Sequence, residues 1–512
     1  MDAHPPLVLA VDQGTTNTKA ALVTPAGDVV ALGSAPVGVT SPRAGWVEQD
    51  PERIWRSVVE AVGTVLRGAV GQGVVTQGAV STAVAGVALS TQRESVLAWR
   101  ASTGRALGPV LGWQDSRTAA WCAEHVDAGA RTEVHRRTGL RVDAMFSAPK
   151  LRWLLDHLPP GTDLADVRVG TVDAWLVWRL TGGREHLCEA GNASRTLLFD
   201  ISELDWSDAL LTVFGIPRAV LPAIRGSSDG FGTCLGVPGL ADGTPVVAVL
   251  ADSHAALYGH GCTTPGTAKA TYGTGSSVMT PVRGLPSAES PVPTTLAWLL
   301  DGTPTYALEG NILSSGAALA WTADLLTGGD VGRLVDLAGT VPGSEGVTLV
   351  PAFTGLGAPH WDRDATALVS GLRTGSGPGH LARAACESVA HQVADVIDVV
   401  ESVVGPLATL RADGGATAAG LLMQDQADLL ALDVEVTDVA EVSALGAAKL
   451  GWQALGAGAA WVEPVAAHRY RPRPTTPGRE ERRATWRREV ARARFVPPPG
   501  ASADRPGQGG RS

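Results

Sequence analysis

Two short polar turns, each set between apolar runs, contain residue types that can hold a phosphate group. The first is residues 12–16 (DQGTT), and the second, far downstream, is residues 273–275 (GTG). Glycine lets a backbone approach an anion, threonine hydroxyls donate hydrogen bonds, and an aspartate can hold a hydrated Mg²⁺. The two turns indicate phosphate binding, although each one taken alone is also typical of an ordinary hairpin.

A third segment of small residues, 413–416 (DGGA), precedes the apolar stretch 421–430. Paired glycines at a helix start allow a nucleotide to lie against exposed N–H groups and the positive end of the helix. The chain has no Gly-x-x-x-x-Gly-Lys-Ser/Thr sequence, so a P-loop is excluded. Three such segments in one chain favour a nucleotide site more strongly than any one of them does.

Charged residues at the ends of apolar runs could bind and activate a second substrate. Arg93 and Glu94 follow the run 84–89 and suit vicinal hydroxyls, or form a surface ion pair. Trp113 could form a wall for the C–H face of a sugar, or pack in the core. Asp252 ends another apolar run and could be a general base, or simply the cap of the next helix.

The elements that must position these residues alternate between strands and helices. Apolar runs at 7–11, 18–23 and 29–32 predict strands around the first turn, and 268–272 and 276–280 predict the same layout around the second. Apolar residues recurring through 381–400 at helical spacing predict a buried helix. The pattern predicts an α/β protein with a duplicated domain, a cleft between the halves and a boundary near 252–266.

Composition excludes several classes of protein. The 512 residues exceed what one hydrophobic core usually serves, so two domains are expected. A net charge of −10 argues against a general nucleic-acid binder, and no stretch approaches the length of a membrane span. Five scattered cysteines without a Cys-x-x-Cys pair indicate reduced thiols. We expect a protein of the cytoplasm whose arginine-rich segment 482–495 is a solvated surface helix rather than a nucleic-acid site.

Several longer motifs resemble the FGGY carbohydrate kinases and, within them, most closely the glycerol kinases. The resemblance runs from about residue 7 to about residue 495. Its motifs are residues 45–51 (GWVEQDP), 145–157 (MFSAPKLRWLLDH), 192–196 (NASRT), 351–362 (PAFTGLGAPHWD), and Gly371-Leu372 with 381–387 downstream.

The resemblance implies two actin/hexokinase-like (ribonuclease H-like) domains around a nucleotide cleft. Residues 1–256 would be the acceptor-binding side, 257–470 the ATP-binding side, and 471–512 a basic terminal helix with a frayed tail. Asp12 would lie on the Mg²⁺ side, holding the metal through water, and Asp252 would be the catalytic base. The implied ATP-binding residues are Gly14, Thr15, Thr16, Lys19, Thr274, Gly275, Gly316, Gly415 and Ala416. The implied acceptor positions are Arg93, Glu94, Trp113, Met145, Asp252, Ser253 and Ser277.

Three acceptor positions depart from the glycerol kinase pattern. Met145 stands where those kinases carry tyrosine, Ser253 where they carry glutamine, and Ser277 where they carry phenylalanine. Near the adenine, Ala320 and Ala419 replace a glutamine and an asparagine. The arginine-bearing loop used for fructose bisphosphate is not recognisable in 236–243, so that regulation is not expected.

The expected activity is transfer of phosphate from ATP, with Mg²⁺, to a hydroxyl of a small polyol or sugar. Glycerol is the default acceptor by overall similarity. A four- or five-carbon polyol or ketose of the erythritol, ribulose or xylulose type is the alternative that the pocket residues suggest. A nucleotide-dependent binding protein without phosphotransfer is the rival from another class. The expected partners are a small molecule and further copies of the chain, in a dimer or tetramer, with neither nucleic acid nor membrane.

Overall fold

A five-stranded sheet forms the centre of the first half of the chain, in the order β13-β5-β1-β2-β3. Its members β1, β5 and β13 are parallel, and β1, β2 and β3 form an antiparallel meander. The run LVLAV in β1 is buried on both faces, as is usual for a central parallel strand. The strands are Leu7–Gln13 (β1), Asn17–Val23 (β2), Val29–Pro36 (β3), Val84–Thr91 (β5) and Val246–Ala251 (β13).

The computed structural model describes residues 6–79, 82–286, 290, 292–439, 441–463, 465–473 and 478–494.

The second half repeats this arrangement in a larger sheet. Its order is β16-β17-β15-β14-β20-β21-β22, in which β21, β20 and β14 are parallel while β14, β15 and β17 are antiparallel. The shared order confirms the predicted duplication, with the β14–β15 hairpin in the place of β1–β2. The strands are Thr267–Tyr272 (β14), Ser276–Val282 (β15), Thr294–Leu300 (β16), Thr303–Ile312 (β17), Thr409–Asp413 (β20), Asp433–Val436 (β21) and His468–Tyr470 (β22).

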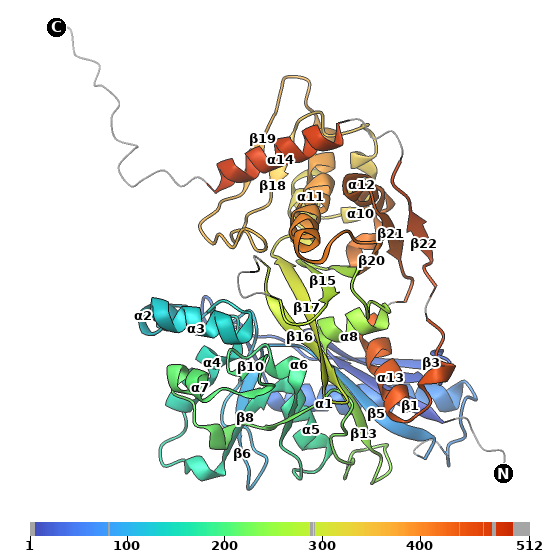
Figure 1. Ribbon diagram of the computed structural model, residues 1–512. Helices are drawn as coiled ribbons and strands as arrows, with labels where there is room; N and C mark the ends of the chain where they lie inside the picture. Colours follow the sequence, from blue (N-terminus) through green and yellow to red (C-terminus); the bar gives the residue numbers. More distant parts are fainter. Residues whose placement is uncertain are drawn as a thin grey trace.

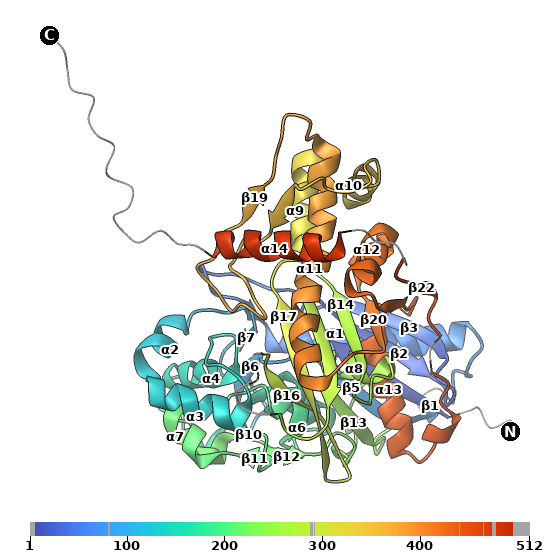
Figure 2. The same cartoon turned by 45° about the horizontal axis from the view of Figure 1, so that its top comes forward.

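Helices cover both sheets (Figures 1 and 2). Helix α1, Pro51–Gly71, packs on β2 and β3 through the apolar stripe Ile54, Val58, Val62 and Val65, and its N-cap Asp50 accepts the Glu52 N–H. The second half contains Gly316–Thr327 (α9), Val331–Ala338 (α10), Pro378–Val404 (α11), Gly420–Leu430 (α12) and the short pair Thr348–Val350 (β18) and Leu368–Ser370 (β19). Helix α11 confirms the predicted buried helix, since Ala385, Val389, Val393 and Ile397 are buried.

A lobe of short helices and strands lies beside the first sheet (Figure 1). Its core is the small sheet β4-β7-β6-β8, around which aromatic side chains such as Trp99 and Trp175 are fully buried. Its strands are Glu48–Gln49 (β4), Val96–Arg100 (β6), Val110–Leu111 (β7), Val167–Thr171 (β8), Leu187–Glu189 (β9), Phe199–Asp200 (β10), Asp205–Trp206 (β11) and Ala223–Arg225 (β12). Its helices are Ala119–His125 (α2), Ala128–Thr138 (α3), Ser147–Asp156 (α4), Val172–Leu180 (α5), Ala190–Ala193 (α6) and Asp208–Phe214 (α7).

The terminal helix α14, Arg479–Ala493, is a surface helix, but it is solvated on one face only and not all round as its arginines suggested. Trp486 is 1% exposed and its indole N–H donates to Asp395 of α11 at 2.7 Å. Arg483 is also buried and pairs with Asp395 at 2.8 Å. A buried arginine needs such a partner, so the helix is bound to the second half by its inner face. The predicted frayed tail after Pro497 lies outside the described residues.

Two helices cross at very short range where the halves meet. Helix α8, Asp252–Gly259, packs on α13, Val442–Ala454, which itself lies on β1, β5 and β13 of the first sheet. A Cβ added at Gly446 would lie 1.8 Å from the Ala255 carbonyl oxygen, and one at Gly259 would lie 2.5 Å from that of Val442. Only glycine fits at either position, and the crossing therefore fixes the place of α8.

Within the described parts of the chain, no helix is both long and apolar enough to cross a membrane.

We expect Gly446→Ala to lower the free energy of unfolding by about 1–3 kcal/mol, because two helix backbones must separate to admit one methyl group. Gly68→Ala in α1 is the matched control, since a Cβ there meets nothing within 4 Å. The control should be neutral or stabilising by up to about 1 kcal/mol. Calorimetric melting of the two variants measures both effects, and equal melting temperatures would contradict the close-packing argument.

Candidate active site

The carboxyl ends of β1, β5 and β13 bring three predicted site residues together. Asp12 lies near the end of β1, Arg93 follows β5, and Asp252 follows β13 as the first residue of α8. Because these strands are parallel neighbours, their ends meet at one edge of the sheet, where ligands bind in open α/β sheets. The Arg93 Nε lies 3.3 Å from the Asp252 carboxylate, and Ser90 donates to Asp12 at 2.7 Å.

The second hairpin forms a cradle in which glycine is required. A Cβ at Gly275 would lie 2.4 Å from the Ile312 carbonyl oxygen, and one at Gly316 would lie 2.6 Å from that of Gly273. Gly414 has φ +98° and no room for a side chain above Tyr272. These close approaches bring the β14–β15 turn, the start of α9 and the short 3₁₀ helix Gly415–Ala418 together.

A cavity of about 670 Å³ lies over this cradle. It contains the predicted residues Thr274, Gly316, Gly415 and Ala416, and its far wall is apolar, with Leu319, Val331, Val335 and Ala419. Its size and lining suit a nucleotide base and ribose above the phosphate turn. Ala320, the other position where an amide was expected, is exposed on α9 and does not line the cavity.

The first turn faces the predicted acceptor residues. The Trp113 indole N–H donates to the Thr15 hydroxyl at 3.0 Å, so the tryptophan wall and this turn are joined. Gly14 closes the turn by donating to the Asn17 carbonyl at 3.0 Å, and Thr16 is exposed. Lys19 pairs with Glu441 at 2.8 Å, and its contact with phosphate stays a prediction.

The two walls of the acceptor side are held by one buried lysine. Lys150 of α4 donates to the carbonyl oxygens of Gly112 and Met145 at 3.0 and 2.7 Å. It therefore fixes the backbone beside Trp113 and at Met145 together. Burial lowers the pKa of Lys150 to about 7. Its position in the 145–157 motif explains why that stretch carries a lysine inside an apolar helix.

A buried network of charges that sequence reasoning missed lies beneath Arg93. Glu309 of β17 accepts from both terminal nitrogens of Arg93, at 2.9 and 2.7 Å, and lies 3.1 Å from Arg195. Arg195 in turn donates to Glu94 at 2.8 Å. The one signal in the sequence is an acid inside the apolar strand YALEGNI, and nothing local indicates its partners.

Ser277 and Ser253 occupy different places at this network. The Ser277 hydroxyl donates to Glu309 at 3.3 Å, and the Ser253 N–H donates to the Asp252 carboxylate at 2.7 Å. The next residue, His254, is fully buried between Thr295 and Gly191, and burial holds its pKa well below the ordinary value. The histidine is therefore a neutral structural residue.

Electrostatics distinguish the two aspartates from ordinary surface acids. Burial and, to a lesser extent, the nearby Asp252 charge raise the pKa of Asp12 to about 7, against the lowering effect of the Ser90 hydrogen bond. Burial also raises the pKa of Asp252, against the effect of Arg93. Asp252 is thereby a stronger base than a free aspartate once it is ionised.

The residues present fit a hydrated Mg²⁺ rather than a protein-enclosed metal. Among the described residues, no group of three or more His, Cys, Asp or Glu side chains could hold an ion. Asp12 offers one carboxylate at the edge of the first sheet. Mg²⁺ is usually bound by one or two carboxylates together with water and substrate phosphates, so one carboxylate is enough. Asp12 would hold the ion and neutralise the phosphate charge with it.

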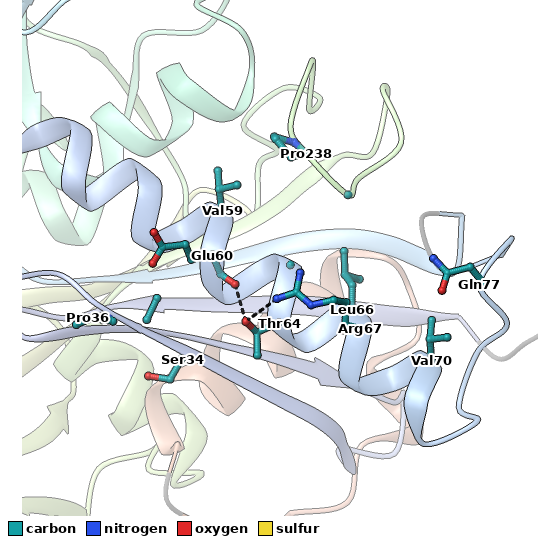
Figure 3. A pocket seen from close by; sticks show the side chains of 13 residues that line it. Ser34, Pro36, Val59, Glu60, Thr64, Leu66, Arg67, Val70, Gln77 and Pro238 are labelled. Carbon is teal, nitrogen blue, oxygen red and sulfur yellow. Dashed lines mark hydrogen bonds between the residues drawn. The ribbon is translucent and has the colours of Figure 1, made fainter.

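A second cavity of similar size, about 640 Å³, contains none of the predicted site residues (Figure 3). It lies between β3, α1 and the loop at Pro238. Some of its polar side chains already form hydrogen bonds within the protein, since Thr64 donates to the Glu60 carbonyl and Arg67 donates to Thr64. The residues predicted to carry the chemistry lie instead at the ends of β1, β5 and β13 and around the cavity over the second hairpin.

Comparison with known proteins agrees with this geometry. Residues 7–259 match the N-terminal domain of the FGGY family of carbohydrate kinases, and residues 268–455 match its C-terminal domain. The chain is 43% identical over 501 residues to a glycerol kinase of Aromatoleum aromaticum, covering 95% of this chain and 98% of that one. It is 42% identical over 508 residues to an apulose kinase of Pectobacterium atrosepticum, covering 96% and 99%.

Solved structures show the same two-domain arrangement. The glycerol kinase of Plasmodium falciparum with ADP superposes with a TM-score of 0.86 at 26% identity, covering 96% of this chain and 99% of that one. The xylulose kinase of Rhodospirillum rubrum gives 0.80 at 25% identity, covering 95% and 98%. The predicted fold, two actin/hexokinase-like α/β domains, is confirmed.

The raised pKa of Asp12 predicts a pH-dependent cost to folding. Folding raises the pKa of Asp12 from 3.8 to about 7, so between these pH values the folded protein binds a proton that the unfolded chain has lost. The contribution of Asp12 to the free energy of unfolding is therefore fully present below pH 3.8 and is lost as the pH rises to about 7. As the pH rises from 3.8 to about 7, we expect the free energy of unfolding of Asp12→Asn to increase relative to that of the wild type, by at most about 4 kcal/mol. Melting of both proteins at several pH values measures the difference, and a constant difference would contradict the burial of this charge.

Proposed function

Because the chain belongs to the FGGY family of carbohydrate kinases, we propose that it transfers the γ-phosphoryl group of ATP to a four- or five-carbon polyol or ketose. Kinase activity toward a small polyol or sugar follows from the family and from relatives matched along nearly the whole chain. The acceptor, Mg²⁺, a cytoplasmic location, the domain limits at 256 and 470, and a dimer or tetramer belong to the proposal.

The observation that carries the proposal is the placement of Asp252. Its carboxylate lies at the same sheet edge as Asp12 and beside Arg93. Arg93 binds Glu309, and Glu309 accepts from Ser277 of β15, the strand that begins just after the Thr274 turn. A base and a phosphate cradle joined in this way suit direct transfer between two bound substrates.

The chain's residues would perform the transfer as follows. Asp252 takes the proton of the acceptor hydroxyl, whose oxygen attacks the γ-phosphorus in line as the bond to the ADP oxygen breaks. The turns at Thr15 and Thr274 hold the phosphates by N–H and hydroxyl donors, and Arg93 orients the acceptor hydroxyls. Mg²⁺, when bound at Asp12, supplies positive charge to the phosphates. The products are ADP and a phosphate ester, and the proton is left on Asp252.

Three residues of the acceptor side, Met145, Ser253 and Ser277, favour an acceptor larger than glycerol. Each is smaller or less polar than the tyrosine, glutamine or phenylalanine of the glycerol kinase pattern. Met145 and Ser253 are both half-buried, and Ser253 adjoins Asp252 in the chain. Methionine has no hydroxyl to donate, and serine has a shorter reach than glutamine, so both lack contacts that would hold a three-carbon acceptor. The 42% identity to an apulose kinase supports the same choice. Glycerol is the second candidate, favoured by the 43% identity to a glycerol kinase.

We expect Asp252→Asn to reduce kcat by ~10²–10⁴ while acceptor and ATP still bind, because only the positioned base is lost. Asp205→Asn is the control, since Asp205 is an exposed acid that pairs with Arg218 far from the site. The control should keep kcat within about twofold, as surface changes usually do. Turnover by Asp252→Asn within roughly threefold of wild type, with an unchanged circular dichroism spectrum, would remove Asp252 from the role of base.

A coupled ADP-release screen over glycerol, tetritols, pentitols and ketopentoses tests the acceptor. We expect a four- or five-carbon compound to exceed glycerol in kcat/KM by ~10-fold or more, the range that one or two missing contacts give. The triple change Met145→Tyr, Ser253→Gln, Ser277→Phe should move the preference toward glycerol. If glycerol is the best acceptor of the wild type, the pocket argument is wrong. ADP release that no acceptor stimulates would favour the rival binding protein.

A further inference from the structure

Glu309 is a fully buried carboxylate that the second half of the chain places beneath the acceptor side of the first. It belongs to β17, which lies in the second sheet and runs beside β16, itself packed on α6 of the first half (Figure 1). Its Oε2 accepts from Arg93 at 2.9 Å and its Oε1 accepts from Arg93 at 2.7 Å, with the Arg195 guanidinium 3.1 Å away. A bidentate pair of this kind fixes both distance and orientation of the guanidinium.

The position of Glu309 is determined by the second sheet and not by the arginines. Its strand pairs with β15 in a register that places Met279 opposite it, and its own N–H donates to the Pro293 carbonyl at 2.9 Å. The Ser277 hydroxyl donates to its Oε1 at 3.3 Å. The carboxylate is thus a rigid anchor to which Arg93 conforms.

Arg93 has five N–H groups, and their use is unequal. Two bind Glu309, and the Nε faces Asp252 at 3.3 Å. The remaining N–H of each terminal nitrogen is the part of Arg93 that can bind an acceptor hydroxyl. If the Arg93 guanidinium rotated away from Glu309, these N–H groups would bind Asp252 instead, because a bidentate pair with a carboxylate is the strongest interaction available to them.

We propose that Glu309 is a positioning residue for phosphotransfer: it holds Arg93 so that Arg93 binds the acceptor and leaves the Oδ2 oxygen of Asp252 to take the proton. The Oδ1 oxygen already faces the Arg93 Nε and accepts from the Ser253 N–H. The second domain thereby completes the acceptor site of the first. Because Asp252 and Glu309 share the single positive charge of Arg93, Arg195 supplies a second cation to Glu309. Arg195 also holds Glu94, whose backbone has φ +59°, in the same network. The inference rests on the proposed function, since it requires Asp252 to be the base.

Glu309→Gln is the decisive variant, because it keeps the shape and removes the charge. We expect acceptor kcat/KM to fall by at least tenfold while the KM for ATP changes less than about threefold. Glu387→Gln is the matched control. Glu387 is another buried acid of the second half, and it pairs with Arg383 at 3.0 Å and accepts from Ser344 at 2.8 Å. It should lower the melting temperature but leave acceptor kcat/KM within about twofold.

A double-mutant cycle with Arg93→Met tests whether Glu309 acts through Arg93. In the Arg93→Met background, Glu309→Gln should change acceptor kcat/KM by less than about threefold, because the group it positions is already gone. The same loss in both backgrounds would overturn the proposal, as would a Glu309→Gln enzyme with normal acceptor kinetics.

Two further arms keep the result interpretable. If Glu309→Gln does not fold, Glu309→Asp retains the charge on a shorter arm and should give a loss of acceptor kcat/KM smaller than that of Arg93→Met; a loss equal to or greater than that of Arg93→Met would overturn the proposal. The wild type is assayed with the same acceptors. A wild type that phosphorylates none of them refutes the proposed function, whereas an active wild type with an unaffected Glu309→Gln refutes only this inference.

Discussion

A charge buried away from water must be paired, and one network of buried charges lies where the two sheets meet. Arg93 and Arg195 lie there with Glu94 and Glu309, each of them less than a tenth exposed. Isolated ions of this kind would cost several kcal/mol apiece, so the arrangement persists only while the partners from both halves are present. The acceptor side of the cleft is therefore built jointly by two units that are far apart in sequence.

That constraint also separates what could be predicted from what could not. Asp12, Arg93 and Asp252 were found because each ends an apolar run, and parallel strands deliver their ends to one edge. The glycines of the second cradle were found because a turn of small residues is visible locally. Both signals lie within a few residues of the side chain concerned.

The roles of Glu309 and Arg195 in the charge network could not be predicted from the sequence, because they depend on contacts across long sequence separations. Glu309 lies 216 residues from Arg93, and one acid in an apolar strand does not identify its partner. Helix α14 was misjudged for a related reason. Its arginine content suggested full solvation, whereas Arg483 and Trp486, three residues apart, share a face that meets Asp395 of α11. Composition outweighed periodicity in that prediction, and the periodicity was the better guide.

The glycine crossing of α8 and α13 has a mechanical consequence. Where Gly446 meets Ala255, the two backbones touch without intervening side chains, and such a contact can act as a pivot between the halves. Asp252 lies three residues from Ala255 along α8, about 4.5 Å at the usual helical rise. A rotation of about 10° around that pivot would move a point on this short lever by less than about 1 Å. Gly415 follows β20 of the second sheet and belongs to neither crossing helix, so its cradle would move with that sheet and admit or release a bulky donor while the base stayed almost stationary.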